Sequence, residues 1–208
     1  MGYIGAGKVS KSMALYQKSR GFEIGGFYSR TVASAQTAAA LTESKVYGSF
    51  SELATSCNII FIATPDDAIS GVAQALSDSI SSLSGKTVIH FSGALSSSSL
   101  DAARQKGAVV FSVHPPLPFS GVITDTGLLD SLIYTAEGQG DAGIIEKLFP
   151  NVRYILPEQK PLYHAAMCIL SNYTVTLANA AQNILTEIGL ELSPFFPLLD
   201  NTLNNICV

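Results

Sequence analysis

The sequence lacks tryptophan and has few charged residues, since aspartate, glutamate, lysine and arginine together make up 13% of its 208 residues. The formal net charge is −4, and no cluster of lysine and arginine with interleaved aromatics is present, which argues against a nucleic-acid-binding surface. No apolar run approaches the roughly 20 residues of a membrane span, and the N-terminus lacks the regions of a signal peptide. We expect a cytoplasmic protein that binds neither nucleic acid nor membrane.

Cysteine is also scarce. The three cysteines, Cys57, Cys168 and Cys207, are odd in number and show no Cys-x-x-Cys spacing, so the sequence indicates neither a disulfide framework nor a zinc site. We expect reduced thiols and no metal. Hydrophobic residues, in contrast, make up 47% of the chain. This content is typical of an α/β protein whose strands are covered on both faces.

A glycine turn follows the first apolar run. The segment Gly5-Ala6-Gly7-Lys8-Val9-Ser10 stands directly behind Tyr3-Ile4 and ahead of a helical pattern. In a dinucleotide-binding turn, the first glycine permits the tight turn, the second lets the backbone approach a pyrophosphate, and the phosphates rest on the helix N-terminus. Ser10 takes the third glycine position, where a small residue allows close packing. Ordinary strand-to-helix turns also use two glycines, but with its neighbours this pattern predicts a dinucleotide site that includes Gly5, Ala6, Gly7, Lys8 and Val9.

The residues after the second predicted strand select the cofactor. Ser29 comes 22 residues after Gly7, where an Asp or Glu would bind the ribose of NAD and repel a 2′-phosphate. Ser29 and Thr31 can instead donate hydrogen bonds to that phosphate, and Arg30 can pair with it. The alternative is an ordinary polar turn with a surface arginine. Because the glycine turn lies upstream, we predict NADP.

The segment Ala63-Thr64-Pro65-Asp66-Asp67 follows another apolar run. It has the features of a helix start, with Thr64 as N-cap, Pro65 in the first position and Asp67 three residues after the cap. In a doubly wound sheet the loop after this strand lies beside the cofactor. We therefore expect Ala63, Thr64 and Pro65 to line the dinucleotide cleft as well.

Two further strand ends carry groups that can move a proton, His90-Phe91-Ser92-Gly93 and His114-Pro115-Pro116. Both would open onto the same carboxyl edge of the sheet, where a histidine can donate or accept a proton near neutral pH. His90 stands within an apolar strand, which favours a structural role. His114 is followed by a rigid proline loop, which favours a catalytic one.

Short apolar runs alternate with helical stretches over residues 5–155, which predicts parallel strands joined by crossover helices. Predicted strands lie at 23–28, 58–63, 87–91, 109–113 and 132–136, and predicted helices at 8–19, 32–41, 66–76 and 98–106. The sequence thus predicts an α/β fold, in which a Rossmann-type, doubly wound, mostly parallel sheet in residues 1–157 precedes a smaller all-helical domain in residues 158–208. Only four residues precede Gly5 and no cap follows the last helix, so we expect residues to be missing at the termini.

The helical pattern of residues 163–188 is apolar almost all round, as in a helix buried between partners. One polar stripe runs along it, formed by His164, Cys168, Ser171, Asn172, Asn179 and Gln182. Such a stripe faces a ligand, water or matching polar groups, because unsatisfied buried polar atoms cost about 1–3 kcal/mol each. A polar seam between subunits is an equal alternative. A helix too apolar to cover itself predicts a homodimer built through the helical domains.

Six segments together resemble a family of predicted bacterial oxidoreductases that pair a Rossmann-like NADP domain with a helical C-terminal domain of unknown function. The segments are Gly-Tyr-Ile-Gly-Ala-Gly-Lys-Val, Phe-Tyr-Ser-Arg-Thr, Ala-Thr-Pro-Asp-Asp-Ala-Ile, His-Phe-Ser-Gly-Ala-Leu, His-Pro-Pro-Leu-Pro-Phe and Tyr-His-Ala-Ala with Ser-Asn-Tyr. The resemblance spans essentially the whole chain. More distantly, the chain is similar to the superfamily of 6-phosphogluconate, β-hydroxyacid and prephenate dehydrogenases, pyrroline-5-carboxylate reductase and deazaflavin-dependent NADP oxidoreductases. It implies a fold and a cofactor, but no substrate.

The resemblance also suggests site residues. In β-hydroxyacid dehydrogenases a lysine four residues before an asparagine is the general acid/base, but if Asn172 matches that asparagine, Cys168 holds the lysine position. Prephenate dehydrogenases are more similar, with a serine after one strand and His-Pro after the next, near the nicotinamide and the substrate hydroxyl. By that resemblance Ser92 and His114 are catalytic, and His164 and Asn172 approach from the helical domain.

These observations predict an NADP-dependent oxidoreductase that transfers a hydride between NADP(H) and a small organic substrate in the cleft between the domains. A non-enzymatic NADP-binding or redox-sensing module is the alternative, and the resemblance adds hydride exchange between NADP and a deazaflavin. No arginine cluster marks a phosphate or dicarboxylate pocket. Nothing in the spacing of Lys160 and Tyr163 assigns them a task.

Overall fold

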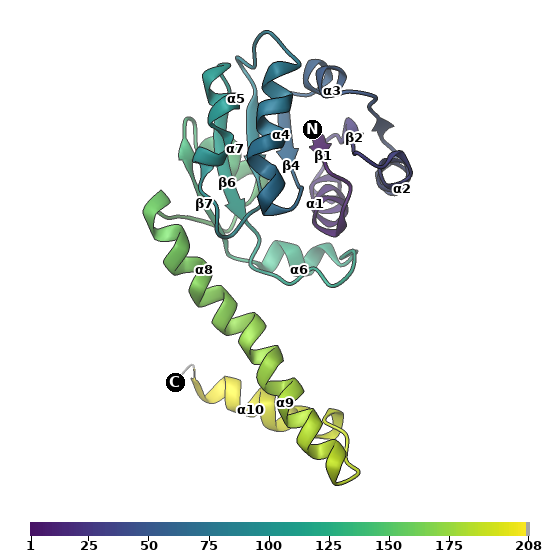
Figure 1. Cartoon of the computed structure of the whole chain (residues 1–208), viewed down its shortest axis with the longest axis vertical. Coiled ribbons are helices and arrows are strands. Elements are labelled where there is room, and N and C mark those ends of the chain that lie inside the picture. Colours follow the sequence, from purple (N-terminus) through teal and green to yellow (C-terminus); the bar gives the residue numbers. More distant parts are fainter. Residues whose placement is uncertain (207–208) are drawn as a thin grey trace. The chain divides into compact units, whose positions relative to one another are not determined.

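The computed structural model describes residues 1–206 (Figure 1). The chain divides into two compact units, Met1–His164 and Ala165–Val208. In the first unit Cys57 is a buried, free thiol. The expectation of a reduced thiol at Cys207 falls outside the described residues.

An eight-stranded sheet forms the centre of the first unit, in the order β3-β2-β1-β4-β5-β6-β7-β8. Neighbouring strands are parallel, except that β6 and β7 are antiparallel. The strand order reverses beside β1, so the topological switch point lies between β1 and β4. The strands are β1 (Gly2–Ile4), β2 (Gly26–Tyr28), β3 (Lys45–Val46), β4 (Ile59–Ile62), β5 (Thr87–His90), β6 (Val109–His114), β7 (Tyr134–Gln139) and β8 (Val152–Tyr154).

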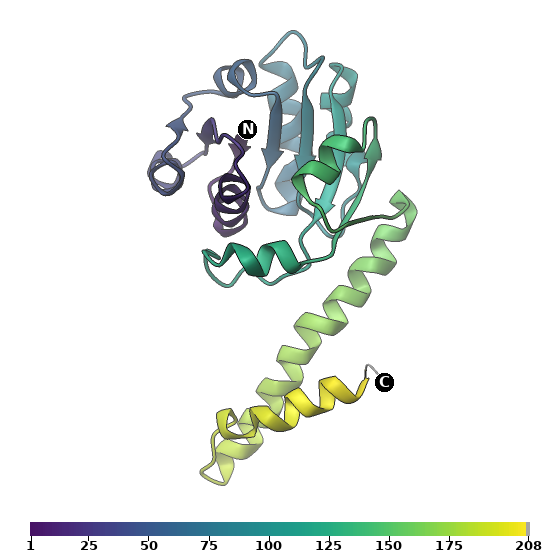
Figure 2. The same ribbon diagram turned by 180° about the vertical axis from the view of Figure 1, so that it is seen from behind.

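Helices cover both faces of this sheet (Figures 1 and 2). Successive strand residues point to opposite faces, so Phe61 of β4 joins one apolar core while Ile60 and Ile62 join the other. The first core is completed by α1 (Lys8–Ser19), α2 (Val32–Thr42), α6 (Thr126–Ser131) and α7 (Gly143–Leu148), and the second by α3 (Phe50–Ser56), α4 (Asp66–Asp78), the 3-10 turn η1 (Ser97–Leu100) and α5 (Asp101–Gln105). The predicted α/β fold with a Rossmann-type, mostly parallel sheet is confirmed.

The sequence pattern located the longer elements well, and α1 spans the predicted residues 8–19. It missed β3, α3, α6, α7 and β8, which have two to seven residues each. Runs of this length contain too few repeats to show a period. A local signal for α3 was nevertheless present, since the hydroxyl of Ser49 accepts a hydrogen bond from the Glu52 N–H and the Glu52 carboxylate accepts one from Gly48.

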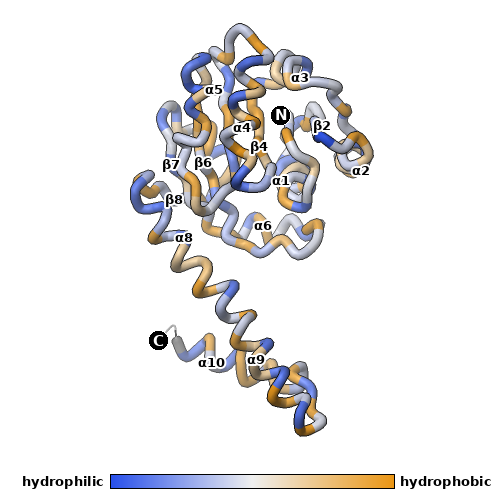
Figure 3. Tube along the Cα trace, viewed as in Figure 1, coloured by the Kyte–Doolittle hydropathy of each residue, from blue (hydrophilic) through white to orange (hydrophobic). Residues whose placement is uncertain are grey.

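The second unit is helical, as predicted. A 3-10 turn, η2 (Pro157–Gln159), leads into α8 (Lys160–Cys168), which crosses the unit boundary. A π-helical turn η3 (Ile169–Tyr173), α9 (Thr174–Glu187), the 3-10 turn η4 (Ser193–Phe195) and α10 (Phe196–Ile206) follow. Figure 3 shows hydrophobic residues along α9 and α10, and no residue of α9 is buried within the chain. Within residues 1–206, no helix has both the length and the apolar character needed to cross a membrane.

Candidate functional site

The glycine turn joins β1 to α1 at the switch point of the sheet. Gly5 has a φ of +101°, and its N–H donates to the carbonyl of Tyr28 at 2.8 Å. A Cβ on Gly5 would lie 2.5 Å from the carbonyl oxygen of Ala63 on the neighbouring strand. Conformation and space therefore both require glycine here.

Gly7 has a different environment, because a Cβ built there would meet no atom within 4 Å. Gly7 is the N-cap of α1 and no side chain caps the helix, so the first N–H groups of α1 are open to an anion. Ser10 is fully buried, and its hydroxyl donates to the Gly5 carbonyl at 2.6 Å. Serine at the third glycine position thus stabilises the turn through this hydrogen bond.

The predicted 2′-phosphate residues lie beside this turn, because β2 pairs with β1 through Tyr28 and Ile4. Ser29 is half-buried, and Arg30 and Thr31 are exposed. Thr31 is the N-cap of α2, but its hydroxyl makes no capping hydrogen bond. These three residues thus follow the carboxyl end of β2, next to the switch point.

Ala63 and Thr64 follow β4 on the other side of β1, where the Ala63 N–H donates to the Ile4 carbonyl at 2.8 Å. The prediction that Thr64 caps the next helix is wrong, because Pro65 is the N-cap and α4 begins at Asp66. Pro65 has an extended ψ of 151°, which shifts the helix start by one residue. The Thr64 hydroxyl is buried and has no hydrogen-bond partner within the described residues. A buried hydroxyl without a partner, beside the glycine turn, fits a residue that lines a cofactor-binding cleft.

Further along the carboxyl edge, His90 at the end of β5 is fully buried. Its Nδ1 accepts the N–H of Ser92 at 3.1 Å and its Nε2 lies 3.0 Å from the Ser96 carbonyl, so these partners place the ring hydrogen on Nε2. Burial lowers the pKa of His90 to about 4. His90 is therefore a neutral core residue that shapes the turn after β5.

The hydroxyl of Ser92 is fully engaged in that turn. It donates to the Asp66 carboxylate at 2.6 Å and accepts the N–H groups of Ala94 at 3.2 Å and Leu95 at 3.0 Å. A hydroxyl has one donor and two acceptor sites, and all three are occupied. Ser92 thus holds the loop after β5 against the start of α4.

His114 and His164 come together over Gly93. A Cβ on Gly93 would lie 2.8 Å from Nε2 of His114 and 2.8 Å from Nδ1 of His164. The two imidazole rings are 6.4 Å apart between centroids, and Tyr163 places its hydroxyl 2.9 Å from Nδ1 of His114. Burial, followed by the positive charge of Lys160, lowers the pKa of His114 to about 4. The ring is therefore uncharged at neutral pH.

The fourth residue predicted to be catalytic, Asn172, belongs to the second unit. It lies in the π-helical turn η3, where it is exposed. Its backbone carbonyl accepts a hydrogen bond from the hydroxyl of Thr176 at 2.9 Å. The structure thus brings together His114, His164 and the Ser92 loop within the first unit.

Sequence reasoning missed Lys160, which is 1% exposed. Its ammonium donates to the Ser92 carbonyl at 2.8 Å and to the hydroxyl of Ser112 on β6. Burial lowers the pKa of Lys160 to about 8, against the opposing effects of the Glu137 and Asp66 carboxylates. A lysine is almost never fully buried unless it is paired, but no feature of the sequence revealed the partners. Over residues 1–206, no three His, Cys, Asp or Glu side chains gather closely enough to hold a metal ion.

A doubly wound sheet with an open glycine turn at its switch point is the arrangement in which Rossmann-type proteins bind dinucleotides. Residues 1–115 match the Rossmann-like domain, and the chain belongs to that family. Residues 140–208 match the domain of unknown function DUF2520. This combination confirms the predicted pairing of a Rossmann-like domain with a helical C-terminal domain. A search of curated proteins found no match.

Several solved structures share the fold over nearly the whole chain. A proposed NADP oxidoreductase from Bacteroides fragilis is 20% identical, with a TM-score of 0.78 over 99% of this chain and 79% of that one. A reductive aminase from Aspergillus terreus in complex with NADPH is 16% identical, with a TM-score of 0.79 over 99% and 72%. The NADP-bound pyrroline carboxylate reductase of Plasmodium falciparum is 16% identical, with a TM-score of 0.66 over 98% and 75%. At these identities the likeness concerns the fold.

Proposed function

We propose that this chain is an NADP-dependent oxidoreductase that transfers a hydride between NADP(H) and a small organic substrate. The observation that carries the proposal is the glycine turn at the switch point, where Gly5 is required by its backbone and Gly7 opens onto free space. The NADP and NADPH complexes among the structures of similar fold support the choice of cofactor.

The residues around the turn fit this cofactor. The N–H groups at the start of α1 would hold the pyrophosphate, together with the backbone of Ala6 and Val9. The side chains of Ser29, Arg30 and Thr31 would hold the 2′-phosphate, with Arg30 supplying the charge. Ala63, Thr64 and Pro65 would line the opposite side of the cleft, where the Thr64 hydroxyl gains a partner. Lys8, whose ammonium donates to the Ser120 carbonyl at 2.6 Å, lies at the rim of this site.

When bound, NADP(H) supplies or accepts the hydride. The chain itself must hold the substrate and handle a proton, and His114 is the group we assign to this task. If the Tyr163 hydroxyl donates to Nδ1 of His114, the ring hydrogen stands on Nε2, the atom that lies over Gly93. Nε2 would then donate a hydrogen bond to the oxygen or nitrogen of a C=O or C=N bond. As that proton moves to the substrate, Nδ1 would take the proton of the Tyr163 hydroxyl, which is only half-buried and regains a proton from water, so the ring stays neutral. His164 borders the same position, and a contribution from Asn172 stays a prediction.

Calorimetric titration with NADPH and, separately, with NADH tests the cofactor assignment. We expect a clear preference for NADPH, because no acidic residue stands at the Ser29 position. In Arg30→Ala, loss of a charge-assisted pair worth about 1.5–3 kcal/mol weakens NADPH binding roughly tenfold to a hundredfold and leaves NADH binding unchanged. The matched control is Arg153→Ala on β8, at the far edge of the sheet, which leaves both affinities unchanged. Absence of binding by either nucleotide would overturn the proposal.

Turnover distinguishes an oxidoreductase from a cofactor-sensing module. The natural assay follows NADPH consumption at 340 nm with a panel of ketones, aldehydes, imines and a deazaflavin. An oxidoreductase oxidises NADPH steadily with at least one of them. Tight NADPH binding without turnover on any panel member would favour the sensing module instead.

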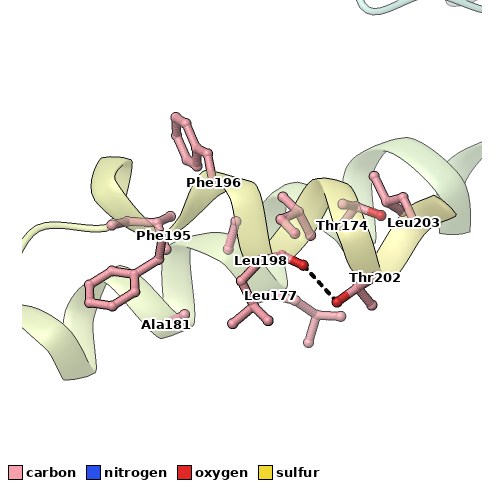
Figure 4. A pocket seen from close by; sticks show the side chains of 11 residues that line it. Thr174, Leu177, Ala181, Phe195, Phe196, Leu198, Thr202 and Leu203 are labelled. Carbon is pink, nitrogen blue, oxygen red and sulfur yellow. Dashed lines mark hydrogen bonds between the residues drawn. The ribbon is translucent and has the colours of Figure 1, made fainter. Parts of the chain in front are cut away.

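We also propose that the second unit forms a homodimer. Its α9, η4 and α10 enclose an apolar groove of about 390 Å³ (Figure 4), lined by Thr174, Leu177, Ala178, Ala181, Leu192, Phe195, Phe196, Leu198, Leu199, Thr202 and Leu203. Leu177 is 71% exposed and Leu198 66% exposed. Contiguous apolar surface of this kind marks an interface, and a second copy presents a complementary apolar helix face.

Light scattering tests this assembly. We expect a dimer for the intact chain, and a monomer when Leu177→Asp places a carboxylate in the groove. The control Lys147→Asp changes charge on α7 of the first unit and leaves the dimer intact. A stable monomer of the intact protein would refute the assembly.

A further inference from the structure

Lys160 is an unusual feature of the carboxyl edge, because its ammonium is buried although the proposed chemistry does not use it. Removing an ammonium from water costs several kcal/mol, and an apolar side chain of similar volume is often as stable in such a place. Methionine would fill this space without that penalty. The charge of Lys160 therefore calls for an explanation beyond packing.

The hydrogen bonds of Lys160 join three elements of the site. From the first turn of α8, its ammonium donates to the Ser92 carbonyl after β5 and to the Ser112 hydroxyl on β6. The Ser112 hydroxyl in turn lies 3.3 Å from the same Ser92 carbonyl. The Ser92 carbonyl belongs to the peptide that leads into Gly93, the residue beneath the His114 and His164 rings. Lys160 thus fixes the Ser92–Gly93 peptide, which lies against both imidazole rings.

The charges around His114 come from several elements. Lys160 and His164 on α8 disfavour a second proton on the ring, and Asp66 on α4 favours it. Tyr163, also on α8, contacts Nδ1 through its hydroxyl. His90 on the neighbouring strand is held neutral. With a pKa of about 8, Lys160 is mostly protonated at neutral pH and contributes a positive charge beside the His114 ring.

Lys160 itself has two carboxylates nearby that keep it protonated. Asp66 lies on α4 and Glu137 on β7, and both raise its pKa against the effect of burial. The Glu137 carboxylate is held by the hydroxyl of Ser97 at 2.9 Å and by the Ser97 N–H. The positive charge is therefore built into the fold rather than supplied by a mobile surface residue.

We propose that Lys160 is a positioning residue, whose ammonium fixes the Ser92–Gly93 peptide beneath His114 and whose positive charge acts together with burial against a second proton on that imidazole, so that the substrate meets the neutral ring. The last clause rests on the proposed function. The effects on the peptide and on the ring are properties of the protein without cofactor or substrate, and they can be measured there.

The test is an NMR titration of the protein labelled with ¹³C in the Cε1 positions of its three histidines. Lys160→Met keeps an unbranched side chain of nearly the same length and removes its charge. We expect the pKa of His114 to rise by about one pH unit or more, as is typical when a nearby like charge is removed. The matched control is Lys86→Met, since the Lys86 ammonium also donates to a backbone carbonyl, that of Cys57 at 3.1 Å. Lys86 stands before the amino end of β5, and its replacement leaves the His114 titration unchanged.

A folded Lys160→Met protein with an unchanged His114 titration would overturn the proposal. Wild-type protein provides a test that does not depend on folding of the variant. Because burial lowers the pKa of Lys160 from 10.5 to about 8, the His114 Cε1 resonance should show a second inflection at alkaline pH, and a resonance that stays flat while Lys160 itself titrates would also overturn the proposal. NADPH affinity measured on the same samples reports on the proposed function alone, so the failure of one is distinguishable from the failure of the other.

Discussion

Gly93→Ala is the sharpest test of the His114 site, because it adds one methyl group at the centre of the site. Gly93 does not have a positive φ, so alanine meets no backbone penalty and the effect comes from the side chain alone. The new Cβ would lie 2.8 Å from His114 Nε2 and equally close to His164 Nδ1, whereas ordinary contact begins at 3.4 Å. Each ring must therefore move by roughly 0.6 Å or more.

This displacement predicts a large effect on turnover and a smaller one on stability. A shift of about 1 Å in a reacting group costs up to 10²-fold in rate, so we expect a loss of kcat of about 10-fold to 10²-fold. Overpacking costs about 1–3 kcal/mol, and the lower end applies because both rings are only partly buried. Since Gly93 lies on the loop after β5, away from the glycine turn, NADPH affinity should stay within about twofold of wild type.

Steady-state kinetics with the substrate found in the NADPH screen, calorimetry with NADPH and urea unfolding measure these three quantities. The matched control is Gly71→Ala on α4, where a Cβ meets nothing within 4 Å. This control should leave turnover unchanged and raise the free energy of unfolding by about 1 kcal/mol, because alanine favours a helix over glycine. Wild-type turnover in folded Gly93→Ala would show that the His114 ring does not act where we place it.

Two further predictions follow from the histidines. His114→Gln should lower turnover by 10²-fold to 10⁴-fold, the usual contribution of a general acid, with NADPH affinity intact, and loss of both properties or of neither would count against the assignment. The folded pKa of His90 is about 4, below its usual 6.5, so the unfolded chain takes up the proton first. The stabilising contribution of neutral His90 is therefore complete above pH 6.5 and is lost as the pH falls toward 4, which amounts to about 2 kcal/mol between pH 7 and pH 5. Urea unfolding at both pH values measures this loss, and an equal loss in His90→Gln would contradict it.

Much of the fold could be predicted from the sequence, because the signals are local. The glycine turn, the helix of residues 8–19 and the apolar strands each show their pattern within a few residues. The N-cap at Pro65 and the short elements β3, α6 and β8 were missed, because a shift of one residue or an element of two to six residues changes the pattern too little to detect.

The contacts at the carboxyl edge around Gly93 were harder to predict. The sequence indicated His114 because a proline loop follows it, and Ser92 because of a resemblance, but it did not show that the Ser92 hydroxyl is already saturated by Asp66 and two backbone N–H groups. Tyr163 had no assigned role until the fold placed its hydroxyl against His114. These contacts join residues that are distant in the chain, so no spacing rule reports them.

By itself, the sequence determined the class of fold and the location of the dinucleotide turn, because both depend on short-range periodicity and on two glycines that stand two positions apart, Gly5 and Gly7. Only the tertiary structure decided the environment of Lys160, which is 68 residues from Ser92 and 48 from Ser112 in the chain. The physical reason is that burial and charge pairing depend on which strand ends meet at the sheet edge. The ends of β5 and β6 meet the start of α8 around Gly93, and there Lys160 becomes a buried cation beside a neutral histidine.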